Sequence, residues 1–470
     1  MAERIRFGTD GWRAVIAREF TFTNVAAVAQ GIADTIRERG TAERGVIVGY
    51  DSRFLSEQFA AEVAAVMAGN GIRSWVSDRD TPTPVLAHAV LTHQAAGAVI
   101  LTASHNPAIY HGIKFVPEYA SPAFPDVTDR IEAHTAEALA RPEQVKRDDS
   151  GRLVESFDPQ SAYFAKLAEV VDLDAIRSAR LKVKVDCLHG AARGYLDRVL
   201  QQAGCDVEAF RVDRNPLFGG GMPDPSAERL RYLAERVVAD GAHLGLAADG
   251  DGDRFGIIDA SGRFLTPNQV IPLVLWHVQR TRFPTGTVAR TVATTHMLDA
   301  LADRLGLGVQ ETPVGFKYLG RALRETDAIV AGEESGGLGV RGHVPEKDGI
   351  LAGLLVTEMV AKTGQSPLQS LKQLQQQVGV FTSKRLDLHV ADTGALMERV
   401  AAAPPSRLAG VEVADTVTLD GLKLIALDGR WMLLRPSGTE PLVRVYLEAH
   451  TPEDLGAMEA EALALVEPQG

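Results

Sequence analysis

The chain has 470 residues, of which 45% are hydrophobic and 23% are charged, and its formal net charge is −12. This length predicts about three or four compact units, and the acidic balance argues against nucleic acid or an anionic membrane surface as a partner. No apolar run approaches the roughly 20 residues of a membrane span.

The charged first residues lack the apolar segment of a secretory signal, so we expect a cytoplasmic protein. Two cysteines, Cys187 and Cys205, are too few to staple a chain of this size, and they lack metal-type spacing. We expect both to be reduced and buried.

Short apolar runs rich in Val, Ile and Ala alternate with stretches of helical period along most of the chain. The runs with their following turns include residues 45–53, 97–101, 181–186, 243–248 and 328–331. This alternation predicts α/β layers with parallel or mixed sheets, in which ligands gather at the carboxyl ends of the strands. Three unusual loops follow such runs and are therefore candidate sites.

The first loop, residues 102–107, reads Thr-Ala-Ser-His-Asn-Pro. Ser104 is a candidate nucleophile at a strand end, with Pro107 making the loop rigid. Taken alone, the serine is better explained as a turn residue that satisfies the backbone, and no G-x-S-x-G elbow surrounds it. A polar stretch at 146–152 then predicts a linker.

The second loop is the sharpest local pattern, because Asp249, Asp251 and Asp253 alternate with glycines directly after an apolar run. Such a loop can aim three carboxylates at one hard cation, and Mg²⁺ suits it. An EF-hand fits poorly because Arg254 and Ala260 stand where Gly and Glu are needed. An acidic surface turn, or an aspartyl-phosphate enzyme using Asp249 or Asp251 as nucleophile, are the alternatives.

The third loop, residues 332–337, reads Gly-Glu-Glu-Ser-Gly-Gly and offers Glu333 and Ser335 as partners for sugar hydroxyls. Residues 337–342 match G-x-G-x-x-G, but no helix follows this match. Dinucleotide binding therefore lacks its required context.

Beyond about residue 375 the pattern changes to short strands. Asp-Gly pairs at 420–421 and 428–429 predict hairpin turns, and residues 452–455 open a terminal helix. Between them, residues 435–441 read Arg-Pro-Ser-Gly-Thr-Glu-Pro, with Arg444 close behind. Hydroxyls, free N–H groups and two guanidinium groups make a plausible phosphate cradle, although a plain turn is an equal alternative.

Together these loops resemble those of the α-D-phosphohexomutase superfamily, the phosphoglucomutases and phosphomannomutases. The resemblance also takes in residues 7–13, 112–115, 315–318 and 346–349, in order along the chain. It implies three α/β domains of like topology with mixed sheets, plus a smaller C-terminal α+β domain, arranged around a central cleft. We expect the domains at 1–152, 153–258, 259–375 and 376–470.

The resemblance assigns a role to each loop. Ser104 would carry the phosphoryl group and, with Asp249, Asp251 and Asp253, would hold Mg²⁺. The implied catalytic residues are Ser104, Arg13, Lys114, His105 and Arg254, and the implied substrate-binding residues are Lys317, Glu333, Ser335, His343, Lys347, Arg435, Ser437, Gly438, Thr439 and Arg444. The general base stays open between Lys114 and His343, with Lys317 and Lys347 as further candidates.

The implied reaction interconverts hexose 1-phosphate and hexose 6-phosphate through a phosphoserine enzyme, with glucose 1,6-bisphosphate as the expected activator. The loop at 333–337 is closer to phosphoglucomutases, since Gly337 stands where phosphoglucosamine mutases carry His, and Ala14 replaces a common Gly. We expect glucose as substrate and mannose as a side substrate. A phosphoglucosamine mutase and a non-catalytic sugar-phosphate binder are the alternatives, and the protein is expected to be a monomer or homodimer.

Overall fold

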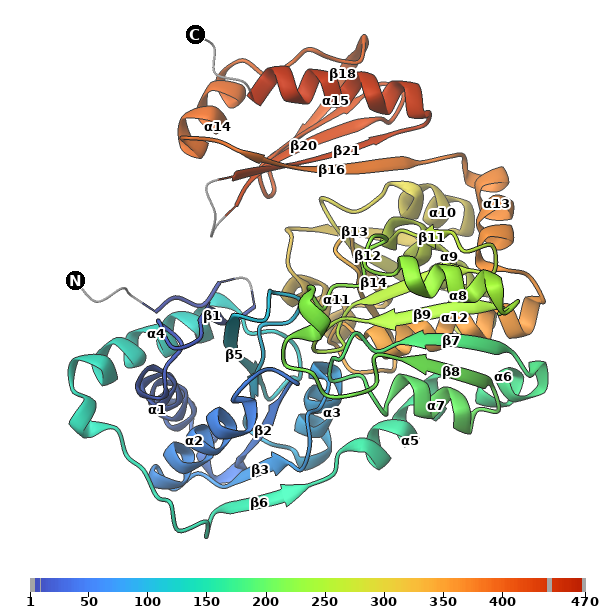
Figure 1. Ribbon diagram of the computed structural model, residues 1–470. Helices are drawn as coiled ribbons and strands as arrows, with labels where there is room; N and C mark the ends of the chain where they lie inside the picture. The colour runs from blue at the N-terminus through green and yellow to red at the C-terminus, as the bar shows by residue number, and fades with distance from the viewer. Residues whose placement is uncertain (1–4, 9, 438–441, 467–470) are drawn as a thin grey trace.

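The computed structural model describes residues 5–8, 10–437 and 442–466, which form four β-sheets with helices packed against them (Figure 1). The expected α/β architecture with a distinct C-terminal α+β part is confirmed. Across these described residues, we find no helix that combines the length and the apolar character needed to cross a bilayer.

The first sheet has the strand order β1-β5-β4-β2-β3-β6. Its strands are β1 (Trp12–Val15), β2 (Val46–Tyr50), β3 (Ser74–Ser77), β4 (Gly97–Leu101), β5 (Tyr110–Pro117) and β6 (Val154–Phe157). Its helices are α1 (Phe22–Glu38), α2 (Ser56–Gly69), α3 (Thr83–His93) and α4 (Pro125–Ala140), with short 3₁₀ turns η1 (Ala42–Arg44) and η2 (Pro142–Gln144). Because β6 pairs with β3, this sheet extends past the boundary expected at residue 152.

Strand β2 illustrates why the runs are continuously apolar. Val46 and Val48 pack in the core that contains residues of α1, α2 and α4, whereas Ile47 packs on the opposite side with residues of α3. A strand covered on both faces has no polar side to present to water.

The second sheet has the order β11-β10-β9-β7-β8. Its strands are β7 (Lys182–Asp186), β8 (Asp206–Phe210), β9 (Leu244–Ala248), β10 (Phe255–Asp259) and β11 (Phe264–Leu265). Its helices are α5 (Gln160–Val170), α6 (Leu173–Ala179), α7 (Leu196–Gln202) and α8 (Arg231–Ala239), with the 3₁₀ turn η3 (Phe218–Gly220).

The third sheet has the order β13-β12-β14-β15. Its strands are β12 (Thr287–Thr291), β13 (Gly308–Thr312), β14 (Ala328–Glu333) and β15 (Gly337–Val340). Its helices are α9 (Pro267–Thr281), α10 (Met297–Leu305), α11 (Phe316–Glu325), α12 (Gly349–Thr363) and α13 (Pro367–Val378).

A common four-strand unit repeats in these three sheets. The orders β5-β4-β2-β3, β10-β9-β7-β8 and β15-β14-β12-β13 correspond strand for strand, with one antiparallel pair and two parallel pairs in each. The three loops singled out in the sequence all connect the antiparallel pair, at β4–β5, β9–β10 and β14–β15. The fold therefore presents them from equivalent positions.

The second and third sheets share one hydrophobic core rather than two separate ones. Helix α12 lies between them, since it contacts β9, β10 and β15, and its Leu354 and Leu355 belong to the same cluster as Val185 and Val330. This shared packing fixes the loop that carries Asp249, Asp251 and Asp253, called the acidic loop below, relative to the loop between β14 and β15.

The fourth sheet is antiparallel along its paired strands, in the order β16-β21-β20-β19-β18-β17, and lies at the top of Figure 1. Its elements are β16 (Thr382–His389), α14 (Thr393–Ala402), β17 (Arg407–Leu408), β18 (Val411–Val417), β19 (Leu422–Ala426), β20 (Trp431–Pro436), β21 (Leu442–Ala449) and α15 (Pro452–Val466). The Asp-Gly pairs lie between β18 and β19 and between β19 and β20, so both expected turns and the terminal helix are confirmed. A separate small cluster, including Val292 and Trp431, joins this sheet to the third.

Candidate active site

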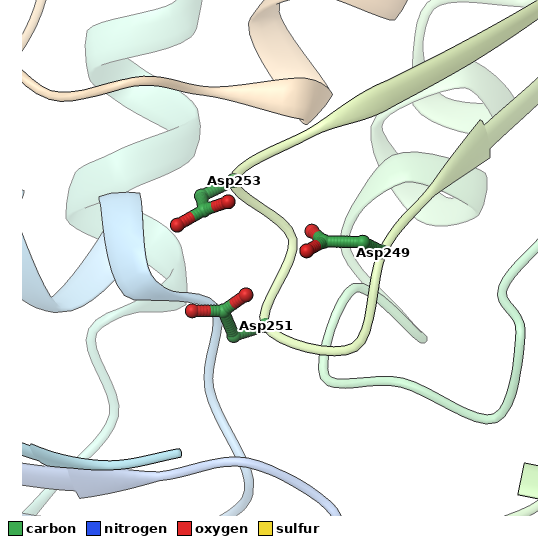
Figure 2. Close-up of side chains that lie close together, drawn as sticks. All are labelled: Asp249, Asp251 and Asp253. Atoms are coloured by element: carbon green, nitrogen blue, oxygen red, sulfur yellow. The ribbon is translucent and has the colours of Figure 1, made fainter. Parts of the chain in front are cut away.

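The loop between β9 and β10 gathers three buried carboxylates. One ligand oxygen from each of Asp249, Asp251 and Asp253 lies within 4.8 Å of the others, and Figure 2 shows the three side chains projecting from this single loop. Gly252 has a φ of 74°, which lets the chain turn tightly between the last two. The Oδ1 atoms of Asp251 and Asp253 are buried without a hydrogen-bond partner. Such orphaned oxygens are suited to a hard cation.

Ser104 reaches this acidic loop from the loop after β4. Its Oγ donates a hydrogen bond to Oδ2 of Asp249 at 3.0 Å, and its side chain is almost completely buried. The residue has a φ of 51°, in the left-handed region that few non-glycine residues adopt. The fold therefore brings together the candidate nucleophile and the candidate metal ligands.

Two lysines lie among the same carboxylates. The Lys114 Nζ atom, on β5, is 2.9 Å from Asp251, 3.2 Å from Asp253 and 2.8 Å from Asp10. The Lys347 Nζ atom is 3.1 Å from Asp253 and 3.3 Å from Asp10. Asp10 thus links the first and third sheets through the two ammonium groups.

Burial and like charge set the protonation of these groups. Burial, together with the neighbouring Asp251 and Asp253, raises the pKa of Asp249 well above its usual value. Burial alone would lower the pKa of Lys114 and Lys347, but the surrounding carboxylates outweigh it and raise both. Lys317 differs, because burial lowers its pKa and its acidic neighbours compensate only in part.

Two further candidates, Arg13 and His105, lie at the loop that carries Ser104. Nη1 of Arg13 donates to Oδ1 of Asn106 at 2.7 Å, within the serine loop. Nδ1 of His105 lies 3.4 Å from Oγ of Ser104. Burial and the nearby cations of Arg254 and Arg13 lower the pKa of His105 well below its usual value, so its ring is neutral near pH 7.

The candidate sugar-binding loop approaches this group from the third sheet. Oγ of Ser335 donates to Oε1 of Glu333 at 2.7 Å. A β-bridge between Arg254 and Gly337 joins the acidic loop to this loop. A Cβ at Gly337 would lie 2.9 Å from Oε1 of Glu333 and 3.1 Å from Cδ of Lys347, so glycine permits this close approach.

The candidate phosphate cradle lies on the fourth sheet. Arg435 of β20 and Arg444 of β21 are cross-strand neighbours, and Ser437 follows β20 directly. Nε of Arg435 donates to Oδ2 of Asp420 at 2.9 Å, and the same oxygen accepts the Val314 N–H from the third sheet. The structure thus places Arg435 against Asp420, not against the acidic loop. Gly438 and Thr439 lie outside the described residues.

His343 is placed differently from the other candidates. Its side chain is fully buried, and its Nε2 lies 2.8 Å from Oδ2 of Asp348, which also accepts the Tyr163 hydroxyl at 2.6 Å. The other oxygen of Asp348 caps helix α12 by accepting the Ile350 and Leu351 N–H groups. These contacts give His343 a role in supporting a helix cap.

Sequence reasoning missed two residues of the site. Asp10 had no assigned role, although it lies in the 7–13 segment that the resemblance used. Thr83, at the start of α3, donates through Oγ1 to Oδ2 of Asp251 at 2.7 Å and through its N–H to the Asp251 carbonyl. No local pattern marks Thr83, because its partner is far away in the chain.

Comparison with known proteins identifies similar chains over the whole length. Family models described as phosphoglucomutase/phosphomannomutase domains I, II and III and the C-terminal domain match residues 4–141, 161–262, 266–378 and 390–465. The chain is 30% identical to a phosphoglucomutase/phosphomannomutase of Thermococcus kodakarensis, covering 95% of each. It is 34% identical to a phosphoglucosamine mutase of Frankia casuarinae, covering 98% of this chain and 97% of the relative. A crystal structure of a candidate phosphomannomutase from Thermus thermophilus superposes with a TM-score of 0.88 at 34% identity, over 100% of both chains.

Proposed function

Because the chain belongs to the phosphoglucomutase/phosphomannomutase family, whose members are intramolecular phosphotransferases of the isomerase class, we propose that it interconverts hexose 1-phosphate and hexose 6-phosphate through phosphorylated Ser104. The observation that carries this proposal is the 3.0 Å contact between Oγ of Ser104 and Asp249 in a group of three buried carboxylates. A serine in such a place can exchange a phosphoryl group only if cations balance the charge.

Mg²⁺ fits the residues that are present. Asp249, Asp251 and Asp253 would hold it together with an oxygen on Ser104, and the orphaned Oδ1 atoms of two aspartates support this set. When bound, the ion neutralises charge on the phosphoryl oxygens.

The chain's own residues perform the transfer. The bond between phosphorus and Oγ of Ser104 breaks while a bond from phosphorus to a sugar hydroxyl oxygen forms. The hydroxyl proton passes to a basic side chain of the site, and Oγ of Ser104 takes up a proton and becomes a hydroxyl again. The bisphosphate then turns over and returns its other phosphoryl group to Ser104. Lys114 and Lys347 stay protonated among carboxylates, so they supply positive charge, as Arg13 and Arg254 do. The proton acceptor is one of the candidate bases named from the sequence, and Lys317 is the lysine among them whose pKa is lowered by burial.

Binding residues in the third and fourth domains complete the proposal. Glu333 and Ser335 would hold the 3- and 4-hydroxyls, which a half-turn of the sugar roughly exchanges. Arg435, Ser437 and Arg444, together with Gly438 and Thr439, would hold the phosphate that is not reacting. A cytoplasmic location, a monomeric or homodimeric state and activation by glucose 1,6-bisphosphate stay predictions.

Glucose is the proposed sugar because the loop at 333–337 resembles that of phosphoglucomutases. Mannose is the proposed side substrate because a site that grips O3 and O4 discriminates weakly at C2. Phosphoglucosamine mutase activity is the second candidate, and the relatives with that name favour it. Comparing kcat/KM for glucose, mannose, glucosamine and N-acetylglucosamine 1-phosphates decides between them. A clear preference for an amino sugar would overturn the glucose proposal.

The position of the phosphoryl group is tested on the isolated phosphoenzyme. Mapping by mass spectrometry is expected to find the phosphate on Ser104, with turnover of glucose 1-phosphate by the same preparation. Hydroxylamine cleaves an acyl phosphate and spares a phosphoserine. Release of phosphate by hydroxylamine would instead support an aspartyl-phosphate on Asp249 or Asp251, while tight binding without turnover would support a binding protein.

A further inference from the structure

The side chain of Arg53, which follows β2, is fully buried beneath the serine loop. An arginine has five N–H groups, and here every one has an acceptor. Nη2 donates to the carbonyl oxygens of Ser104 (2.7 Å) and Asn106 (2.6 Å), Nη1 to those of Pro107 (2.9 Å) and Tyr110 (2.9 Å), and Nε to Oδ2 of Asp51 (3.1 Å). Four of the five contacts therefore hold the backbone of one segment, which runs from Ser104 through the loop to Tyr110 at the start of β5.

Thr102 also links the serine loop to the carboxylate of Asp51. Oγ1 of Thr102 donates to Oδ2 of Asp51 at 2.6 Å and accepts the Ser104 N–H at 2.8 Å. The N–H and the carbonyl of Ser104 are thus both anchored, on either side of its left-handed φ of 51°. Such a conformation costs energy and persists only where surrounding contacts impose it.

Residues from the domain of the second sheet also contact Arg53 and the serine loop. The ring of Phe218 covers the Arg53 guanidinium at 5.0 Å. The acidic loop also approaches the carbonyl of Ser104 closely, since a Cβ built at Gly250 would lie 2.5 Å from that oxygen. A small displacement of the Ser104 carbonyl would therefore disturb the contact between the serine and the acidic loop.

We propose that Arg53 is a positioning residue for phosphoryl transfer, which holds the loop so that Oγ of Ser104 faces the acidic loop. This inference rests on the proposed function of Ser104 as phosphoryl carrier. Arg53 acts through the backbone and touches neither the reacting oxygen nor any residue assigned to the sugar. Its loss should slow the transfer step and leave sugar-phosphate binding nearly unchanged.

Arg53→Lys is the direct test. Lysine keeps the charge but offers three donors from one nitrogen atom, so it cannot bind four carbonyls that lie in two directions. The rate at which glucose 1,6-bisphosphate phosphorylates Ser104 in a single turnover, followed by intact mass, is expected to fall about 100-fold. The Kd for glucose 1-phosphate, measured by calorimetry, is expected to stay within about threefold.

The matched control is Arg282→Lys. Arg282 also binds a buried carboxylate, that of Glu358, but its contacts lie outside the serine loop. Both variants should lose thermal stability, and only Arg53→Lys should lose phosphorylation rate. Should Arg53→Lys not fold, Thr102→Val is expected to slow phosphorylation about tenfold by removing the link to Asp51.

These experiments distinguish failure of the inference about Arg53 from failure of the proposed function of Ser104. Phosphorylation of folded Arg53→Lys within threefold of the unmodified protein overturns the inference, as does an equal loss in Arg282→Lys. Where Arg53→Lys does not fold, normal phosphorylation of Thr102→Val overturns it. If the unmodified protein is never phosphorylated on Ser104, the proposed function itself fails.

Discussion

Oγ of Ser104 donates a 3.0 Å hydrogen bond to Oδ2 of Asp249 across 145 residues of sequence. The contact joins the first and second sheets through loops that occupy equivalent positions in the repeated four-strand unit. Burial and two further aspartates raise the pKa of the accepting carboxyl, so the pair lies where added negative charge is costly without a cation.

Ser104→Ala tests the serine directly. The variant removes the phosphoryl acceptor but leaves the three aspartates, so we expect kcat to fall by about 10⁴-fold or more while the fold is kept. Mutase turnover of glucose 1-phosphate and the circular dichroism spectrum are the measurements. Substantial turnover in this variant would defeat the assignment of Ser104.

Removal of the metal tests the acidic loop independently of activity. Mg²⁺ should raise the Tm of the unmodified protein, since free ligand at about 100 times its Kd stabilises the native state by about 2.7 kcal/mol. Asp253→Asn removes one charged ligand and should weaken both this shift and turnover, and EDTA should reverse the shift. Asp174→Asn alters an exposed carboxylate outside the loop and serves as control. An unchanged Mg²⁺ shift in Asp253→Asn would contradict the assigned site.

Sequence patterns located the parts of the candidate site whose chemistry is carried by neighbouring residues. The three loops, the aspartate triad and the hairpin turns of the fourth sheet each follow from a short segment and its flanking strands. Arg53 was not found, because its function depends on carbonyl groups more than 50 positions away that any sequence could supply.

Contacts between residues distant in sequence determine the positions of β6 and His343, which local sequence patterns did not predict. The polar stretch before β6 predicted a linker, yet pairing of β6 with β3 keeps the next strand in the first sheet. The sequence made His343 a candidate base, but its ring contacts Asp348 instead of facing the acidic loop. A buried carboxylate at the start of a helix needs hydrogen-bond partners, and His343 supplies one of them.

His343→Phe separates a structural role of His343 from its role as a candidate general base. The ring that packs on Tyr163 is kept and the hydrogen bond to Asp348 is lost. We expect the free energy of unfolding to fall by about 1–3 kcal/mol and kcat/KM to stay within about threefold. Tyr163→Phe, which removes the other side-chain bond to the same oxygen, should behave alike. A loss of kcat without loss of stability would restore His343 as a base.

The buried carboxylate of Glu358 should make stability depend on pH in the acid range. Burial alone would raise its pKa, but hydrogen bonds from His277, Arg282 and the Asp172 N–H outweigh burial and lower the pKa to about 2. Because the pKa is lower in the folded state, this group stabilises the protein above about pH 4.5, and the contribution is lost as pH falls toward 2.

Glu358→Gln measures that contribution, because the amide keeps the shape and removes the titration. Urea unfolding should give a loss of about 3 kcal/mol at pH 7, because folding lowers the pKa from 4.5 to about 2, and the difference from the unmodified protein should shrink between pH 4.5 and pH 2. The exposed Glu235→Gln should change stability by less than about 0.5 kcal/mol across the range. A difference that stays constant with pH would mean that Glu358 acts through packing and not through its charge.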